Sequence, residues 1–154
     1  MSLVIATGSN LDDPILQLAT AKKYLCQQWK LIAESRIYQS AAVDYFDQPD
    51  FFNQVLEFQL PTHQSPEEAM RIMLEIENQM GRVRVVDKGP RVIDIDLLFF
   101  GLTTYKSVTV EVPHPRLWTR SFVIKPLSEL PFYTQLKTQF TFTENFAVDA
   151  TPLN

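Results

Sequence analysis

The chain contains the stretch RVIDIDLLF at residues 91–99, whose β-branched and aromatic residues predict a β-strand. Successive side chains of a strand point to opposite faces, so Asp94 and Asp96 are expected to share one face. The apolar residues of the other face are expected to enter the core: Ile93, Ile95, Leu97 and Phe99. The strand is therefore anchored on one side and presents two carboxylates on the other.

The segments that precede this strand complete a β-α-β-β-α-β order. Strand-like segments lie at residues 3–6, 31–38 and 51–60, and the last two are suited to antiparallel pairing. Helix-start signals lie at Asp12-Asp13-Pro14 and at Ser65-Pro66-Glu67-Glu68, and the second helix is expected to end near Met80. The order predicts an α+β, ferredoxin-like fold: an antiparallel sheet with helices packed on one face.

The residues after this strand are expected to extend the same fold. Val108–Val112 is typical of an added edge strand, and residues 120–130 are typical of a short helix or turn. The remaining residues carry no clear pattern. Since 154 residues with 45% hydrophobic content suffice for one core, residues 1–154 are expected to form a single domain.

The composition limits which kinds of partner the protein is expected to bind and in which compartment it is expected to work. A net charge of −4 argues against a protein whose whole surface binds nucleic acid or anionic lipid. Cys26 is the only cysteine, which excludes an internal disulfide, and with His63 and His114 it is too few for a closed zinc site. With no signal peptide and no apolar run that would span a bilayer, the protein is expected to be soluble and cytoplasmic.

A basic cluster directly precedes the two aspartates. Residues 81–91, GRVRVVDKGPR, hold three arginines and a lysine, and arginine grips phosphate oxygens with a planar fork. The chain's glycines, at 8, 81, 89 and 101, fit neither a P-loop nor a Rossmann motif. Cations beside carboxylates therefore suggest a Mg²⁺-polyphosphate site held by side chains. Taken separately, each feature is more typical of a solvated face or a solvated loop.

Two further groups are candidates for ligand binding. Phe51 and Asn53 share one face of the 51–60 strand, where an aromatic plane and a carboxamide would stack on and hydrogen-bond a flat heterocycle. The alternative is that Phe51 is an ordinary buried ring. Residues 112–122 place His114 beside arginines and aromatics in one loop, although a loop histidine is more often exposed or a structural hydrogen-bonding group.

Together these motifs resemble the 6-hydroxymethyl-7,8-dihydropterin pyrophosphokinase family of folate biosynthesis. The likeness spans residues 3–131 through segments in matching order: Gly8–Asn10, Gln48–Asn53, Gly81–Arg84, Gly89–Leu98, Val112–Arg116 and Arg120–Phe122. The family has the ferredoxin-like fold. It transfers pyrophosphate from ATP to the pterin hydroxymethyl oxygen and releases AMP.

The resemblance implies a role for each matching residue. Asp94 and Asp96 are the implied ligands of two Mg²⁺ ions. Arg82 and Arg91 are the implied phosphate clamps. These four residues form the implied catalytic set. The implied ATP-binding residues are Glu77, Arg82, Arg84, Arg91, His114 and Arg120. The implied pterin-binding residues are Ser40, Val43, Phe51, Asn53 and Phe122, with the two rings sandwiching the pterin.

Two alternatives stay open. A noncatalytic ferredoxin-like module that binds RNA would share the fold, although the acidic chain and the carboxylate pair count against it. The second alternative is a degenerate family member that acts as an assembly module. It stays open because the segments around Ala41 and Lys88 depart from the family pattern. The expected partners are ATP and the pterin, without nucleic acid or membrane, for a protein that is a monomer.

Overall fold

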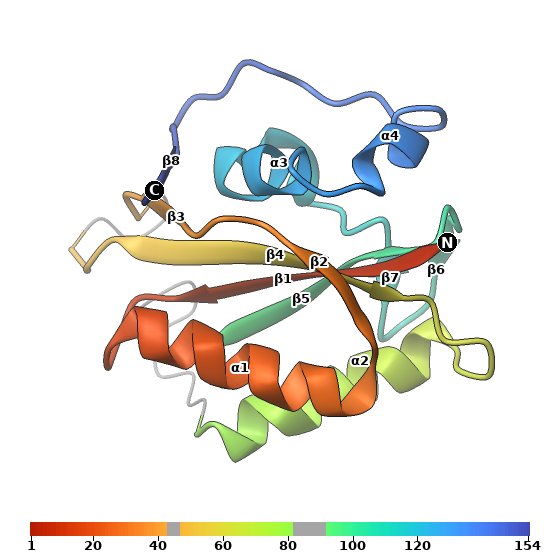
Figure 1. Ribbon diagram of the computed structural model, residues 1–154. Coiled ribbons are helices and arrows are strands. Elements are labelled where there is room, and N and C mark those ends of the chain that lie inside the picture. Colours follow the sequence, from red (N-terminus) through yellow and green to blue (C-terminus); the bar gives the residue numbers. More distant parts are fainter. Residues whose placement is uncertain (43–46, 82–91) are drawn as a thin grey trace.

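A six-stranded antiparallel sheet forms the centre of the structure, a computed structural model that describes residues 1–42, 47–81 and 92–154 (Figure 1). Its strands run in the order β5-β1-β4-β3-β8, and β2 also pairs with β4. The strand bounds are β1 Ser2–Ser9, β2 Leu31–Glu34, β3 Tyr38–Ser40, β4 Phe51–Gln59, β5 Asp94–Phe100 and β8 Thr151–Pro152. The predicted element order and the antiparallel sheet are confirmed.

Helices cover both faces of this sheet. The predicted helices, α1 (Pro14–Gln28) and α2 (Pro66–Gln79), pack on one face, whereas α3 (Ser121–Leu127) and α4 (Tyr133–Leu136) lie on the other (Figure 1). The expectation of helices on one face therefore describes only the first pair. Within the described part of the chain, no helix has both the length and the apolar character needed to cross a membrane.

The predicted helix-start signals act as expected. The Ser65 hydroxyl accepts the Glu68 backbone N–H, and the Glu68 carboxylate accepts the Ser65 backbone N–H, which is a complete capping box. At the start of α1, the Asp13 side chain accepts the Leu16 N–H and Pro14 occupies the first turn. These caps satisfy backbone donors that a helix leaves unpaired.

The added edge strand of the main sheet was predicted in the wrong part of the chain. Only Glu111–Val112 (β7) is a strand, and it pairs with β6 (Tyr105–Lys106) in a separate two-stranded sheet. The strand that extends the main sheet is β8, which pairs with β3 and comes from the segment without a sequence pattern. Two residues are too few for an alternation to be visible in the sequence.

The predicted 31–38 strand is divided in two by Ser35. Glu34 pairs with Leu56, and Tyr38 pairs with Asn53. The chain from Glu34 to Tyr38 therefore contains one residue more than the stretch of β4 that lies opposite it. Ser35 occupies the break: its backbone N–H donates to the Val55 carbonyl, and its hydroxyl accepts the Val55 N–H at 2.9 Å. A side-chain hydrogen bond thus replaces one backbone pair of the ladder.

A second irregularity corrects the predicted face of Phe99. The register between β1 and β5 shifts between Val4 and Ile5, where Val4 pairs with Phe99 and Ile5 with Leu97. Phe99 therefore packs in the core on the α3 side, and Phe100 takes its place in the core beneath α1 and α2. Ile93, Ile95 and Leu97 lie in that core as expected.

Candidate active site

Four residues on four neighbouring strands form a row across one end of the sheet. Tyr38 of β3 pairs with Asn53 of β4, Asn53 with Gly8 of β1, and Gly8 with Asp94 of β5. Adjacent strands lie about 4.8 Å apart, so Asp94 and Asn53 are separated by about 10 Å across Gly8. The predicted metal ligand and the predicted pterin-binding amide thus belong to one surface, on the face that carries α3.

Asp94 and Asp96 share this face, as the alternation in β5 predicts. Asp96 is about one-third exposed, with 34% of its side-chain surface accessible. Burial and the neighbouring charge of Asp94 raise the pKa of Asp96 to about 7, while the nearby guanidinium groups of Arg120 and Arg116 act in the opposite direction. The charge of Asp94 thus disfavours the ionised form of Asp96.

This donor set fits Mg²⁺. Magnesium prefers oxygen ligands and is commonly held by one or two carboxylates, with waters and substrate phosphates completing the shell. Among the residues that the structure describes, no cluster of three or more acidic, histidine or cysteine side chains could hold a metal by itself. A metal bound by Asp94 and Asp96 would therefore need oxygens from substrate and water.

His114 lies against the carboxylate pair and is uncharged at neutral pH. Its backbone N–H donates to the Leu98 carbonyl at 3.0 Å, and its Nδ1 accepts the Arg116 N–H at 3.2 Å. Its Nε2 lies 3.9 Å from Asp96 Oδ1. Burial, with the nearby charges of Arg120 and Arg116, lowers the pKa of His114 to about 4. The imidazole is therefore a neutral group that faces Asp96 through Nε2.

Arg120 links the carboxylates to the predicted pterin ring. Its positive charge acts on both Asp96 and His114, and its guanidinium carbon lies 5.4 Å from the centroid of the Phe122 ring. Arg120 is the N-cap residue of helix α3, and Phe122 lies in the first turn of that helix. A cation over an aromatic face stabilises both positions.

Asn53, on the same face of the sheet, has a buried acceptor. Its Oδ1 is buried and has no hydrogen-bond partner among the described residues. Its Nδ2 lies close to the backbone of Gly8, where an added Cβ would come within 2.5 Å. Gly8 is thus required for the close approach of the amide, and the orphaned oxygen is suited to a donor from a ligand.

Phe51 and Ser40 lie beside Asn53, as predicted for one pocket. Ser40, which is buried, pairs with Phe51 across β3 and β4, and Phe51 is two residues from Asn53 on the same strand face. Alternate residues Phe52 and Leu56 pack in the core on the opposite side of the sheet, which confirms the predicted division of β4. The partly buried Phe51 ring therefore lies on the same face of the sheet as Asn53.

Sequence reasoning did not single out Asn10. This side chain is buried, and its Nδ2 donates to Gln48 Oε1 at 2.9 Å and to the Pro49 carbonyl at 3.1 Å. Asn10 thereby fixes the chain that enters β4 just before Phe51. The signal was available, because Asn10 and Gln48 lie in two of the motifs that matched the family.

Arg116 is the second residue that was missed. Its charge acts on both Asp96 and His114, and its backbone N–H fixes the His114 ring. The sequence places it two residues after His114, within a matched motif. A cation so close to a candidate phosphate-binding histidine was a usable signal.

Glu77 lies behind the carboxylate strand. It is buried in α2, and its Oε2 accepts the Ile95 backbone N–H at 2.7 Å, between the two aspartates. The structure thus shows a contact that anchors the outer edge of β5. The predicted contact of Glu77 with ATP stays a prediction, as do the ligand contacts of His114, Arg120 and Phe122.

Replacing Glu77 with alanine should lower the free energy of unfolding by about 1–3 kcal/mol, because a buried N–H in β5 loses a charged acceptor. Glu77→Gln should keep most of the stability, since an amide oxygen also accepts. Glu75→Ala, an exposed position on the same helix, is the matched control in urea unfolding. Equal stability of Glu77→Ala and Glu75→Ala would contradict the anchoring role.

Four predicted site residues, Arg82, Arg84, Arg91 and Val43, lie outside the described residues. The structure therefore says nothing of the two phosphate clamps or of the backbone predicted to line the pterin pocket. Their roles remain predictions from the sequence.

Comparisons with known proteins identify the family of this chain. A family model described as 7,8-dihydro-6-hydroxymethylpterin-pyrophosphokinase (HPPK) matches residues 4–131. A Bacillus subtilis protein named 2-amino-4-hydroxy-6-hydroxymethyldihydropteridine pyrophosphokinase is 38% identical over 128 residues, which cover 82% of this chain and 75% of the relative. The family match covers nearly the range in which the sequence motifs were found.

Longer proteins also contain a matching region. The folic acid synthesis protein fol1 of Pneumocystis carinii is 38% identical over 130 residues, which are 84% of this chain but only 17% of that protein. A crystal structure of the Plasmodium falciparum HPPK-DHPS triple mutant with pteroate superimposes with a TM-score of 0.52 at 15% identity. This match covers 88% of this chain and 33% of that one, and it supports the fold alone.

The family match and the fold agree with the identification made from the motifs, and they do not favour an RNA-binding or assembly module. The fold, the paired aspartates of β5 and the extent of the match all lead to one assignment: the chain belongs to the 7,8-dihydro-6-hydroxymethylpterin-pyrophosphokinase family.

Proposed function

We propose that this chain transfers the pyrophosphoryl group of ATP to the hydroxymethyl oxygen of 6-hydroxymethyl-7,8-dihydropterin, in folate biosynthesis. The observation that carries the proposal is the row across the sheet, in which Asp94 and Asn53 flank Gly8 on one surface. A metal-polyphosphate site and a heterocycle site about 10 Å apart suit a reaction that joins the two ligands. The products are AMP and the pterin diphosphate.

Asp94 and Asp96 form the metal side of the proposed site. They would hold two Mg²⁺ ions, and Mg²⁺ supplies neutralisation of the polyphosphate charge and orientation of the reacting oxygens. Arg120, whose charge already acts on Asp96, is positioned to meet a phosphate oxygen. Arg82, Arg84 and Arg91 are proposed to bind ATP from the 81–91 segment, together with Glu77 and His114.

The pterin side consists of rings and hydrogen-bonding groups. Phe51 and Phe122 are proposed to stack on the two faces of the heterocycle, and the orphaned Asn53 oxygen would accept an N–H from its edge. Ser40 and the backbone near Val43 complete this side of the proposal. A planar heterocycle with N–H donors would stack on the proposed rings and supply a donor to the Asn53 oxygen.

The transfer itself requires positioning and charge neutralisation. The pterin alcohol oxygen forms a bond to the β-phosphorus of ATP, and the bond from that phosphorus to the bridging oxygen of the α-phosphate breaks, so AMP leaves with the electron pair. His114 is not arranged as a base, because its Nδ1 already accepts the Arg116 N–H and its Nε2 faces a carboxylate. The hydroxyl proton is therefore proposed to be released to water as the new oxygen–phosphorus bond forms.

The domain organisation, the oligomeric state and the compartment of the enzyme are also proposed. Residues 1–154 are proposed to form one pyrophosphokinase domain, because the segment after residue 131 packs on the same sheet and adds β8 to it. We propose a cytoplasmic monomer that uses neither nucleic acid nor membrane as a partner. The exposed free thiol of Cys26 suits a reducing compartment.

Calorimetric titration with a nonhydrolysable ATP analogue tests the binding half of this proposal. The analogue should bind with Mg²⁺ present and bind more weakly in excess chelator, because the carboxylate pair then repels the phosphates. Asp96→Asn should reduce the difference between the two conditions. Binding that is equal with and without Mg²⁺ in the unmodified protein would contradict the metal-polyphosphate site.

Phe122→Ala should weaken pterin binding by about 1–3 kcal/mol, the scale of one lost aromatic stack, while ATP affinity changes less. Fluorescence titration with the pterin and calorimetry with the ATP analogue measure the two affinities. Phe142→Ala is the control, because it removes a ring that contacts Phe99 and Trp118 on the same side of the sheet. Loss of ATP binding with unchanged pterin binding would show that Phe122 serves the other substrate.

A further inference from the structure

The segment 148–154, which we call the strap, lies between helix α3 and strand β3. On the helix side, the buried Ser121 hydroxyl donates to the Val148 carbonyl at 2.6 Å. Lys125 Nζ donates to the Asp149 carboxylate and, at 3.1 Å, to the Ala150 carbonyl. Ser121 and Lys125 lie one helical turn apart, so the strap contacts one side of α3 from its first residue to its last turn.

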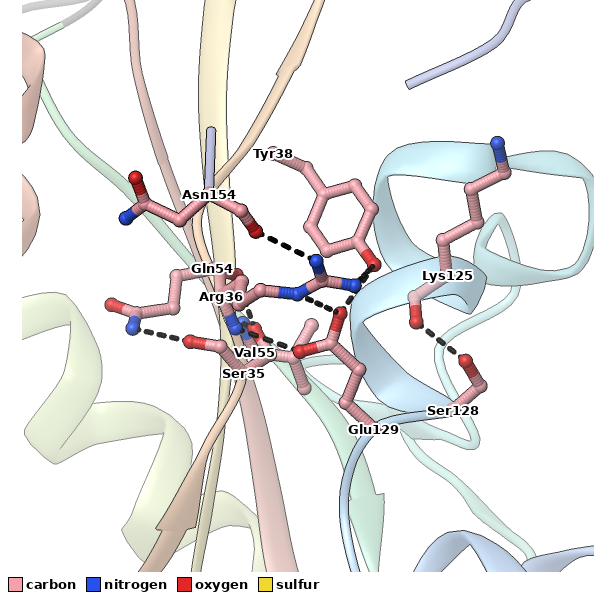
Figure 2. Close-up of polar contacts among 9 residues, drawn as sticks. All are labelled: Ser35, Arg36, Tyr38, Gln54, Val55, Lys125, Ser128, Glu129 and Asn154. Carbon is pink, nitrogen blue, oxygen red and sulfur yellow. Dashed lines mark hydrogen bonds and ion pairs between the residues drawn. The ribbon is translucent and has the colours of Figure 1, made fainter. Parts of the chain in front are cut away.

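The strap is also hydrogen-bonded to the edge of the main sheet. Its strand β8 pairs with β3 through Tyr38 and Gln39, and the Leu153 N–H donates to the Ile37 carbonyl at 3.0 Å. Arg36 Nη1 donates to the Asn154 carbonyl at 2.7 Å (Figure 2). The strap therefore contacts α3 through its first residues and β3 through its last.

A second connection joins α3 to the same strand. Glu129, just after the helix, accepts the Arg36 backbone N–H at 2.9 Å and Arg36 Nε at 3.1 Å, and it also accepts the Tyr38 hydroxyl (Figure 2). Burial and the bond to Glu129 raise the pKa of Tyr38 to about 12, so this hydroxyl remains a donor. Helix α3 is thus connected to β3 by Glu129, just beyond the helix, and by the strap, which contacts Ser121 and Lys125 of the helix.

Helix α3 depends on such contacts for its position. It has seven residues and contains Pro126, and its N-cap residue, Arg120, makes no side-chain cap hydrogen bond. A helix this short has little stability of its own, so tertiary contacts determine where it lies. Apolar packing of Val123, Ile124 and Leu127 holds it on the sheet, but apolar contacts are not directional.

We propose that the strap is a positioning device for the pterin pocket, with Ser121 and Lys125 as positioning residues. The helix carries Phe122, and β3 carries Ser40, which pairs with Phe51. By joining helix to strand, the strap determines how far the Phe122 ring stands from the Phe51 side of the pocket. The inference deepens the proposed function and rests on its assignment of Phe51 and Phe122 to the pterin.

The device acts on the pterin more than on ATP. Arg120 is held from the other side by the 3-10 turn η1 (Leu117–Thr119), because its N–H donates to the Leu117 carbonyl at 3.1 Å. Asp94 and Asp96 belong to β5, at the opposite edge of the sheet from β8. Releasing the strap should therefore change the pterin affinity and leave the metal-polyphosphate side nearly intact.

The test compares Lys125→Met with Lys137→Met, a surface lysine near Tyr133 that serves as the matched control. Lys125→Met should raise the pterin Kd about three- to tenfold, the net scale of one ordinary hydrogen bond, with the ATP-analogue Kd within about twofold of wild type. Lys125→Arg should restore the pterin affinity, since it keeps both donors. Ser121→Ala, which removes the other contact, should repeat the effect.

Amide hydrogen exchange at Leu153 reports separately whether the strap has been released. Faster exchange in Lys125→Met together with a raised pterin Kd supports the proposal. Faster exchange with wild-type pterin affinity overturns it, and so does unchanged exchange in both Lys125→Met and Ser121→Ala. If the unmodified protein does not bind the pterin, that result contradicts the proposed function itself. Titration of the unmodified protein alone detects this outcome, so it is distinguished from a failure of the strap proposal.

Discussion

Asp96→Ala is expected to lower kcat for AMP formation by a factor of about 10²–10³, and Asp94→Ala by a similar factor, because each removes an oxygen ligand from the proposed metal-polyphosphate site. Both side chains lie on the face of β5 that is opposite the core beneath α1 and α2. The loss should therefore arise in the chemistry and in Mg²⁺ dependence, with the fold retained. Steady-state assays over a range of Mg²⁺ concentrations measure it.

Stability measurements separate this loss from misfolding. The raised pKa of Asp96 means that the folded state disfavours its ionised form, so its contribution to stability falls as the pH rises from about 4 through about 7. Asp96→Asn should consequently be at least as stable as the unmodified protein at pH 8 without Mg²⁺. Glu144→Ala, at an exposed site, is the control in these stability measurements.

Wild-type turnover in both Asp94→Ala and Asp96→Ala would exclude the aspartates as metal ligands.

Gly8→Ala is expected to lower kcat/KM for the pterin by about 10- to 100-fold, which corresponds to the cost of forcing an added methyl group into a packed site. The new Cβ would come within 2.5 Å of Asn53 Nδ2, so the amide must move away from its place beside the sheet. The Asn53 oxygen would then be displaced from the position proposed for accepting a donor of the pterin. The KM for ATP should change much less than the KM for the pterin.

A double-mutant cycle with Asn53→Ala tests this explanation. Gly8→Ala alone should also lower the melting temperature, whereas Gly8→Ala added to Asn53→Ala should cost little, because the clashing amide is gone. The two activity losses should be far from additive for the same reason. Additive losses would show that Gly8 acts independently of Asn53.

Local signals in the sequence predicted the skeleton of the fold correctly. The caps at Asp13 and Ser65 act through hydrogen bonds within a few residues, so their effect can be read without the rest of the chain. The alternation around Asp94 and Asp96 likewise depends only on strand geometry. Motif order along the chain was enough to identify the family, which the family match confirms.

The features that could not be predicted depend on a partner strand or a distant segment. Phe99 changes face because β1 shifts register opposite it, and Ser35 interrupts a strand because it bonds to Val55. The strand β8 exists because β3 offers an open edge, and its two residues have no pattern of their own. The same holds for Asn53, whose orphaned oxygen is evident only from its surroundings.

The most direct test of the central claim is a product analysis with ATP, 6-hydroxymethyl-7,8-dihydropterin and Mg²⁺, followed by ³¹P NMR and chromatography. The proposed function predicts AMP and the pterin diphosphate in equal amounts, with neither product formed in excess chelator. Formation of ADP with a pterin monophosphate, or no consumption of ATP while the folded protein is present, would contradict it.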